Sequence, residues 1–108
     1  MKRGDFVTTV MQGDYGKPRP ALVIQSDSFG ERASVTVLPL SSTLVNAPMY
    51  RVTVQPDSEN GLRKPSQVMI DKAMTVKRDK AGPIIGHIDH DAMVEVERLL
   101  AVFLGIVK

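Results

Sequence analysis

The sequence contains no cysteine, so it can form neither a disulfide nor a thiolate metal site. Aromatic residues make up only 5% of the chain, and a peptide-groove module needs an aromatic lining that so few cannot supply. No uninterrupted apolar run reaches the roughly 18 residues that a transmembrane helix requires. Nothing indicates an oxidising compartment. We therefore expect a cytoplasmic protein without a membrane partner.

The remaining composition is that of an ordinary globular protein. A chain of 108 residues predicts one domain, spanning 1–108, that can bury one modest core. Hydrophobic residues make up 43% and charged residues 24%. The formal net charge of +2 permits a nucleic-acid partner without requiring one.

Short runs of β-forming residues between turn residues predict a mainly β domain. The expected strands are Phe6–Met11, Ala21–Gln25, Ala33–Leu40, Tyr50–Gln55, Ser66–Ile70, Lys72–Val76 and Ile84–Ile88. Ala21–Gln25 is continuously apolar at its start, as expected of a central strand. Pro39 has no amide hydrogen to donate to a ladder, so we expect it at a strand end or a sheet edge.

The end of the chain has a helical hydrophobic period. It predicts one helix from about His90 to about Val107, with Asp89 as the N-cap. Its apolar face is expected to comprise Met93, Val96, Leu100 and Phe103, with Leu99 and Leu104 beside them. Such a helix would cover a small β-sheet or barrel.

Arg19 stands between two prolines, directly before an apolar run. Each proline restricts its own φ and biases the preceding residue toward extended geometry. A guanidinium held in this way suits phosphate binding, because its planar fork offers several fixed donors and stays charged. In the preceding loop, Asp14 could orient Arg19, and Tyr15 could stack on a base. The alternatives are a surface arginine and an ordinary surface loop.

Further polar residues stand near expected strand ends. Ser41, Ser42 and Thr43 could donate to phosphate oxygens, or their hydroxyls could cap their own turn. Asp71 lies inside an apolar run, where a carboxylate needs a partner or a shifted pKa. It is a candidate general base, or a strand-end residue that accepts from backbone amides. The spacing of His87 and its neighbours favours helix capping over metal binding, so we expect no metal and no cofactor.

Taken in order, these segments resemble the MazF/PemK (Kid) family of toxin–antitoxin ribonucleases over essentially the whole chain. The resemblance is carried by Arg3-Gly4-Asp5, Arg19–Gln25, Leu38–Ser42, Gly61–Ser66, Val68–Asp71 and Ile85–Asp89. It implies a small, strongly curved SH3-like β-barrel with a C-terminal helix, assembled as a homodimer. It also implies metal-independent cutting of single-stranded RNA at short sequences. The implied partner is an antitoxin with an acidic tail over the RNA groove, in a complex that binds DNA.

The resemblance also implies roles for individual residues. Arg19 would bind the scissile phosphate, Ser41 would donate to a phosphate oxygen, and Asp71 matches an acid that some members of the family use as general base. RNA contacts are expected at Asp14, Tyr15, Lys17, Ser42, Thr43 and Lys72. The chain departs from the family where some members place a second arginine, because Met69 stands there. Either Arg19 acts with Ser41 alone, or Lys72 substitutes, or the activity is altered.

Two other functions remain open. The CcdB toxins share this fold but poison DNA gyrase through a C-terminal helix that ends in an aromatic residue followed by Gly-Ile. The ending Phe103–Ile106 is similar, although a glycine at a helix end is also an ordinary terminator. The third hypothesis is an inert SH3-like binding module.

Overall fold

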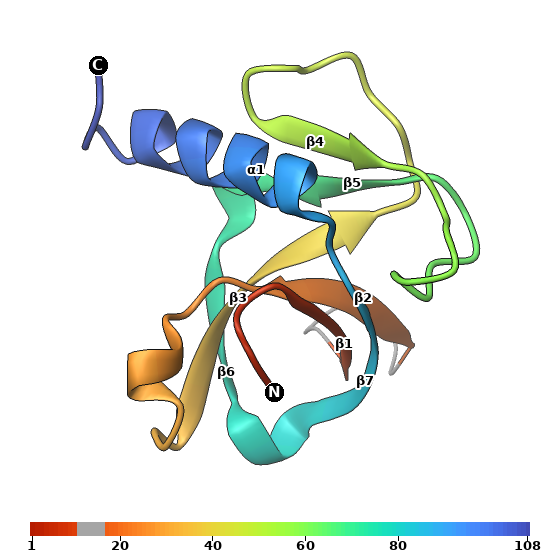
Figure 1. Cartoon of the computed structure of the whole chain (residues 1–108), viewed down its shortest axis with the longest axis vertical. Helices are drawn as coiled ribbons and strands as arrows, with labels where there is room; N and C mark the ends of the chain where they lie inside the picture. Colours follow the sequence, from red (N-terminus) through yellow and green to blue (C-terminus); the bar gives the residue numbers. More distant parts are fainter. Residues whose placement is uncertain (11–16) are drawn as a thin grey trace.

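A strongly curved antiparallel sheet with one helix packed against it makes up the computed structural model, which describes residues 1–10 and 17–108 (Figure 1). The described strands are β1 (Asp5–Val10), β2 (Pro18–Val23), β3 (Ser34–Ser41), β4 (Arg51–Val54), β5 (Ser66–Met69), β6 (Met74–Lys77) and β7 (Ala81–His87). The helix is α1 (His90–Phe103), and three short 3₁₀ helices are η1 (Asp27–Phe29), η2 (Ile70–Lys72) and η3 (Arg78–Lys80). The predicted fold class is confirmed. Asp14 and Tyr15 lie outside the described residues.

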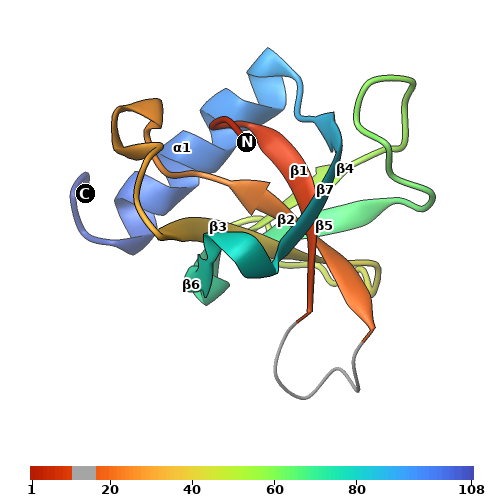
Figure 2. The same cartoon turned by 90° about the horizontal axis from the view of Figure 1, so that it is seen from below.

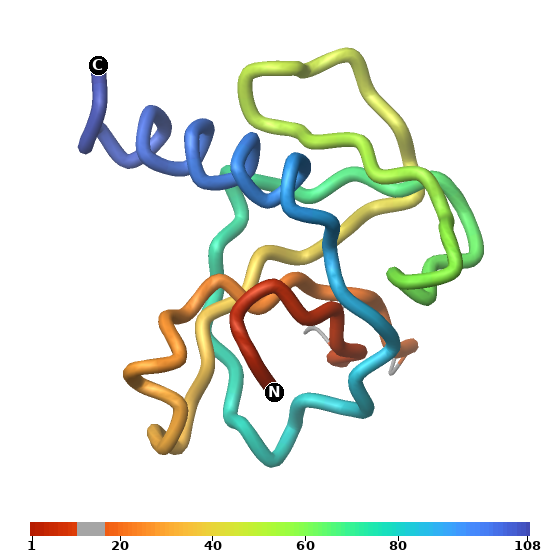
Figure 3. The backbone as a smooth tube through the Cα atoms, viewed as in Figure 1, coloured from red at the N-terminus to blue at the C-terminus, as the bar shows by residue number. Residues whose placement is uncertain are grey.

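The strands form one sheet in the order β4-β5-β3-β2-β1-β7, with β6 paired to β3. The outer strands β4 and β7 are linked through the loop between β4 and β5, because the His87 amide donates to the Glu59 carbonyl at 3.0 Å. Figure 3 shows this loop beside the end of β7, and Figure 2 shows the sheet curling around under α1. The sheet is thus barrel-like without a closed strand ladder among the described residues.

Pro39 lies inside the central strand rather than at its end or at an edge, so that expectation was wrong. On one side of β3, residues 34–37 pair with β6, whereas Leu40 and Ser41 pair with β5. The chain passes from β5 to β6 through η2, opposite Pro39. The missing amide hydrogen therefore falls at a break between two partner strands, where no donor is needed.

Strand β2 begins at Pro18, three residues earlier than predicted, and ends at Val23. Val23 accepts from Gly4 on the β1 side, and Ile24 donates to Thr36 on the β3 side. Alternation along the strand then places the nitrogens of Pro18 and Pro20 on the β3 side. There β3 pairs only with residues 21–23, so both prolines are tolerated within the strand.

Two apolar clusters lie on opposite faces of the sheet. The larger lies under α1 and joins buried side chains of the sheet, such as Phe6, Leu22, Leu38 and Val68, to Met93, Val96 and Leu99 of the helix. The smaller consists of Val7, Ala21, Val23, Val35 and Val37. Of the described helices, none combines the length and apolar character that a membrane span needs.

Helix α1 begins as predicted, because the Asp89 side chain accepts from the Ala92 amide at 3.2 Å. It ends at Phe103, four residues before the predicted end. Gly105 has φ of 76°, and the amides of Gly105 and Ile106 donate to the carbonyls of Val102 and Ala101. This αL termination closes the helix. Phe103 and Leu104 are 52% and 58% exposed, so the predicted apolar face extends too far.

The other differences concern element boundaries. The predicted strand Lys72–Val76 is β6 and starts at Met74, because Asp71 and Lys72 belong to η2. The 3₁₀ helix η3 forms the whole connection between β6 and β7, and β7 begins already at Ala81. Pairing of Ala81 with Thr9 of β1 extends this strand beyond the predicted Ile84–Ile88.

Candidate functional site

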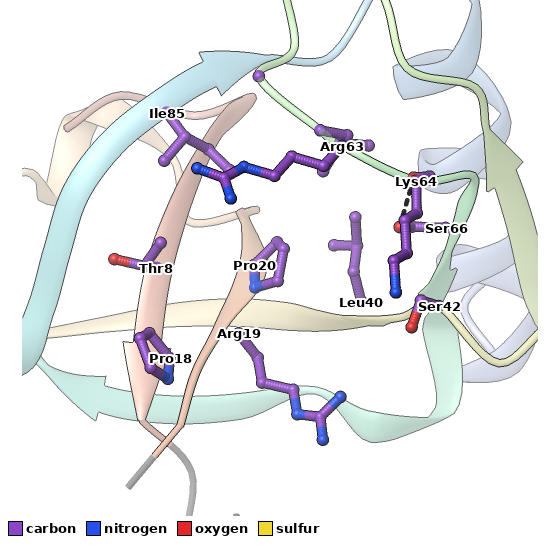
Figure 4. Close-up of a pocket in the computed structure, with 12 residues that line it drawn as sticks. Thr8, Pro18, Arg19, Pro20, Leu40, Ser42, Arg63, Lys64, Ser66 and Ile85 are labelled. Atoms are coloured by element: carbon purple, nitrogen blue, oxygen red, sulfur yellow. Dashed lines mark hydrogen bonds between the residues drawn. The ribbon is translucent and has the colours of Figure 1, made fainter.

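A cavity of about 480 Å³ opens where the start of β2, the end of β3 and the loop before β5 meet (Figure 4). Its described lining comprises Thr8, Pro18, Arg19, Pro20, Leu40, Ser42, Gly61, Leu62, Arg63, Lys64, Ser66 and Ile85. Three of these side chains are basic, three carry a hydroxyl and none is acidic. The cavity therefore combines a positive rim with an apolar floor.

Arg19 reaches this cavity from within β2, where its backbone pairs with Thr9 of β1. The residue is half-buried, and the prolines on both sides hold its backbone extended. Figure 4 shows its side chain leaving β2 on the side of the cavity opposite Arg63. The structure thus places Arg19 on a rigid strand at the rim of a concave, basic surface. Lys17, one of the expected RNA contacts, is exposed directly before β2.

Ser41 is the last residue of β3, and its hydroxyl lies beside the backbone of Thr43 rather than in the lining of the cavity. The Ser41 Oγ accepts from the Thr43 amide at 3.1 Å and donates to the Thr43 carbonyl at a longer 3.4 Å. The turn thus caps itself, as in the simpler of the two interpretations. The next residue, Ser42, does line the cavity, so Arg19 and Ser42 share one concave surface.

Asp71 lies elsewhere in the protomer. Strand β5 starts at the cavity with Ser66, and Asp71 follows beyond its other end, in η2 beneath α1 (Figure 1). Its Oδ1 is buried without a hydrogen-bond partner among the described residues, and its Oδ2 lies 3.6 Å from the Lys72 Nζ. The structure therefore groups Asp71 with Lys72, and does not bring this pair to Arg19 within one chain.

Sequence reasoning did not include Arg63 and Lys64 among the candidate site residues. Both are exposed, and both line the cavity. Figure 4 shows Arg63 extending toward Ile85 and Lys64 extending toward Ser42. The available signal was the Asn60-Gly61 pair directly before them, because this dipeptide is typical of a tight, ordered turn.

The loop that carries these two cations is fixed by a buried asparagine. Asn60 is 1% exposed, and its side chain accepts from the amides of Asp57 and Leu62 and donates to the Gln55 carbonyl at 2.8 Å. Gly61 follows with φ of 69°. The loop is therefore an ordered part of the site and not a free connection.

Tight packing against β7 holds the same loop from outside. A Cβ at Gly61 would lie 2.0 Å from the Ile85 carbonyl oxygen, and one at Gly86 would lie 2.3 Å from the Asn60 carbonyl carbon. Only glycine allows the two backbones to approach so closely. At the end of β7, His87 Nε2 lies 3.8 Å from a Glu59 carboxylate oxygen.

The comparisons with known proteins agree on one family. The sequence model of the PemK-like, MazF-like toxins of type II toxin–antitoxin systems matches residues 2–104. A probable endoribonuclease MazF of Mycolicibacterium smegmatis is 44% identical over 107 residues, which cover 98% of each chain. The endoribonuclease EndoA of Bacillus subtilis is 26% identical, over 99% of this chain and 97% of that protein.

Solved structures share the fold. An endoribonuclease from a mycobacterial species, solved with its cognate antitoxin, superposes with a TM-score of 0.85 at 22% identity and covers 100% of this chain and 98% of that one. MazF in a MazE–MazF complex from Deinococcus radiodurans gives 0.78 at 24% identity, over 97% and 96% of the two chains.

Proposed function

Because the chain belongs to the PemK-like, MazF-like toxins of type II toxin–antitoxin systems, we propose that it is an endoribonuclease that cuts single-stranded RNA at short sequences without a metal ion. The observation that carries the proposal is Arg19, held extended between two prolines at the rim of a basic cavity. RNA brings its own nucleophile, the 2′-hydroxyl. The protein then has to bind the phosphate, stabilise charge and transfer protons.

The proposed reaction is a transesterification at phosphorus. The 2′-oxygen attacks, the bond to the 5′-oxygen breaks, and the products are a 2′,3′-cyclic phosphate and a 5′-hydroxyl. Arg19 holds the scissile phosphate and neutralises the charge that develops on its oxygens. The Ser41 hydroxyl donates to one of these oxygens. Its own proton makes only the 3.4 Å contact to the Thr43 carbonyl, so it can turn to a phosphate at little cost.

Two protons must move in this reaction. Asp71 takes the proton of the 2′-hydroxyl through its carboxylate, which lies beside Lys72. The leaving 5′-oxygen receives its proton from Lys72 or from Arg19, because Met69 occupies the position where some family members have a second arginine. A Lys72→Gln variant that keeps the wild-type kcat would exclude Lys72 as the proton donor and leave Arg19.

We propose two protein partners, and we place the complex in the cytoplasm. One partner is a second copy of the chain, because the end of α1 and the residues after it carry five exposed apolar side chains of the kind that mark protein interfaces: Val102, Phe103, Leu104, Ile106 and Val107. The other is an antitoxin whose acidic tail competes with RNA for the basic groove. The mycobacterial structure named above is a complex with its cognate antitoxin, and the Deinococcus structure is a MazE–MazF complex.

The proposed function is tested by incubating the purified protein with a long, mixed-sequence RNA in EDTA and mapping the 5′ ends. We expect discrete cuts with 5′-hydroxyl ends. Arg19→Ala should abolish them, whereas Arg32→Ala, a matched change at an exposed arginine of the η1–β3 turn, should leave them unchanged. A folded, antitoxin-free protein that cuts no RNA but traps gyrase on DNA would replace the proposal with the gyrase hypothesis.

A further inference from the structure

We propose that Arg63 and Lys64 form a second phosphate site, and that the cavity between them and Arg19 holds the nucleotide next to the scissile phosphate. The identification of the ligand as RNA rests on the proposed function. The site itself rests on the charge, the rigidity and the lining of the cavity.

The charge of the cavity favours two phosphates. Arg19 and the Arg63–Lys64 pair lie on different sides of it in Figure 4, with Pro20 and Leu40 between them. Neither Arg63 nor Lys64 makes a side-chain hydrogen bond or ion pair with the part of the chain that the structure describes, and both are exposed. With no carboxylate in the described lining, the pair is available for an anion from outside.

The position of the pair is fixed before any ligand arrives. Asn60 binds the loop through its buried side chain, and Gly61 packs directly against the backbone of β7. On the other side, the Ser66 hydroxyl donates to the Lys64 carbonyl at 3.0 Å. A preformed pair of cations loses less conformational entropy on binding than cations on a free loop would.

The lining between the cations suits a sugar and a base. Pro20, Leu40 and Ile85 offer an apolar floor, and the hydroxyls of Thr8 and Ser42 lie at its edges. A volume of about 480 Å³ lies within the usual range of small-ligand cavities. In a single strand, successive charged phosphates are separated by a sugar that carries a flat aromatic base, which matches a positive rim around an apolar floor. An acidic peptide supplies the charges but lacks the flat group between them.

The test measures binding separately from cleavage. The probe is a random-sequence, single-stranded 20-mer without 2′-hydroxyls, which no attack by a 2′-oxygen can cut, and binding is followed by fluorescence anisotropy from 50 to 200 mM salt. Arg63→Gln and Lys64→Gln should each weaken binding about three- to tenfold and lower the salt slope by roughly 0.7. The matched control is Lys77→Gln. Lys77 is exposed and pairs with Ser34 at the far end of β3, so its loss should change neither quantity.

Cleavage of a mapped RNA site gives the second readout. For Arg63→Gln and Lys64→Gln we expect a higher KM with a nearly unchanged kcat, in contrast to the lost kcat of Arg19→Ala. If both variants bind the probe with the affinity and salt slope of the wild type, the second phosphate site is wrong, even if the protein cleaves RNA. If they bind the probe normally but lose affinity for a Glu-rich peptide, the cavity serves an acidic peptide, and the proposal also fails. If both variants bind the probe more weakly than the wild type, but the wild type itself cuts no RNA, the second phosphate site is supported and the ribonuclease proposal is overturned instead.

Discussion

Two adjacent hydroxyls at the end of β3 face different surroundings. Ser41 is oriented by the Thr43 amide, whereas Ser42 lines the cavity. We therefore expect Ser41→Ala to lower kcat about 100-fold, which is typical for the loss of one donor to a developing oxyanion. Ser42→Ala should mainly raise KM. Single-turnover cleavage of a mapped oligonucleotide separates the two effects.

Ser41 also caps its turn, so the variants need a structural control. Ser41→Thr keeps the hydroxyl and should retain most of the activity, and thermal unfolding of all three variants reports any damage to the fold. A Ser41→Ala protein that cleaves like the wild type, beside an inactive Ser42→Ala protein, would exchange the two roles.

Gly61 and Gly105 both have positive φ but differ in their surroundings. A Cβ at Gly61 would collide with the Ile85 backbone, whereas one at Gly105 meets nothing within 4 Å. Gly105→Ala should therefore cost only the left-handed conformation, about 1 kcal/mol. Gly61→Ala should cost at least about 2 kcal/mol more, because backbone atoms must move. Urea unfolding measures the free energy of unfolding of both variants. Equal losses of stability would show that the loop around Gly61 can rearrange at little cost.

At the scale of the helix, the start of α1 depends on one carboxylate. The Asp89 side chain accepts from the Ala92 amide, so Asp89→Ala should destabilise the protein by about 1 kcal/mol. Asp91 is also in the first turn, but its side chain caps no amide among the described residues, and only its charge interacts favourably with the helix dipole. Asp91→Ala should accordingly cost about 0.5 kcal/mol or less. Similar losses in chemical denaturation would assign the effect to charge alone.

Local sequence patterns were sufficient to locate the strands and the start of the helix. Alternating or continuous apolar residues predicted every strand that the structure describes, and Asp89 marked the start of α1. The predicted start of β2 came too late, because Pro18 belongs to the strand, and Pro39 was wrongly expected at a strand end or sheet edge. A proline is compatible with a strand when its nitrogen faces a gap in the pairing. That gap is a property of the neighbouring strands, and nothing adjacent in the sequence announces it.

At the scale of the whole molecule, Asp71 and Arg19 lie apart. Arg19 lines the cavity at the start of β5, whereas Asp71 follows the other end of that strand. If both act in one cleavage event, the proposed homodimer must bring Asp71 of one protomer to Arg19 of the other. We expect inactive Arg19→Ala and inactive Asp71→Asn proteins to regain activity when mixed after dissociation, because a mixed dimer then contains one intact composite site. About a quarter of the wild-type rate is the expected order of magnitude for random mixing.

The control for this experiment is a mixture of Arg19→Ala with Ser41→Ala, whose residues lie near one another at the same end of the sheet. It should remain inactive if those two act within one protomer. An Asp71→Asn mixture that also stays inactive would mean that Asp71 serves its own protomer or supports η2 beneath α1.

The sequence by itself determined the β-rich fold with its C-terminal helix, the family, and Arg19 as the leading candidate. These follow from hydrophobic periodicity, proline geometry and motif order, which are local properties of the chain. Only the tertiary structure decided that Arg63 and Lys64 face the cavity with Arg19, and that Asp71 does not. The loop after β4 reaches its place by packing Gly61 and Asn60 against β7, a contact between segments far apart in sequence. Pairings of that kind depend on how the sheet curves, and no local pattern encodes them.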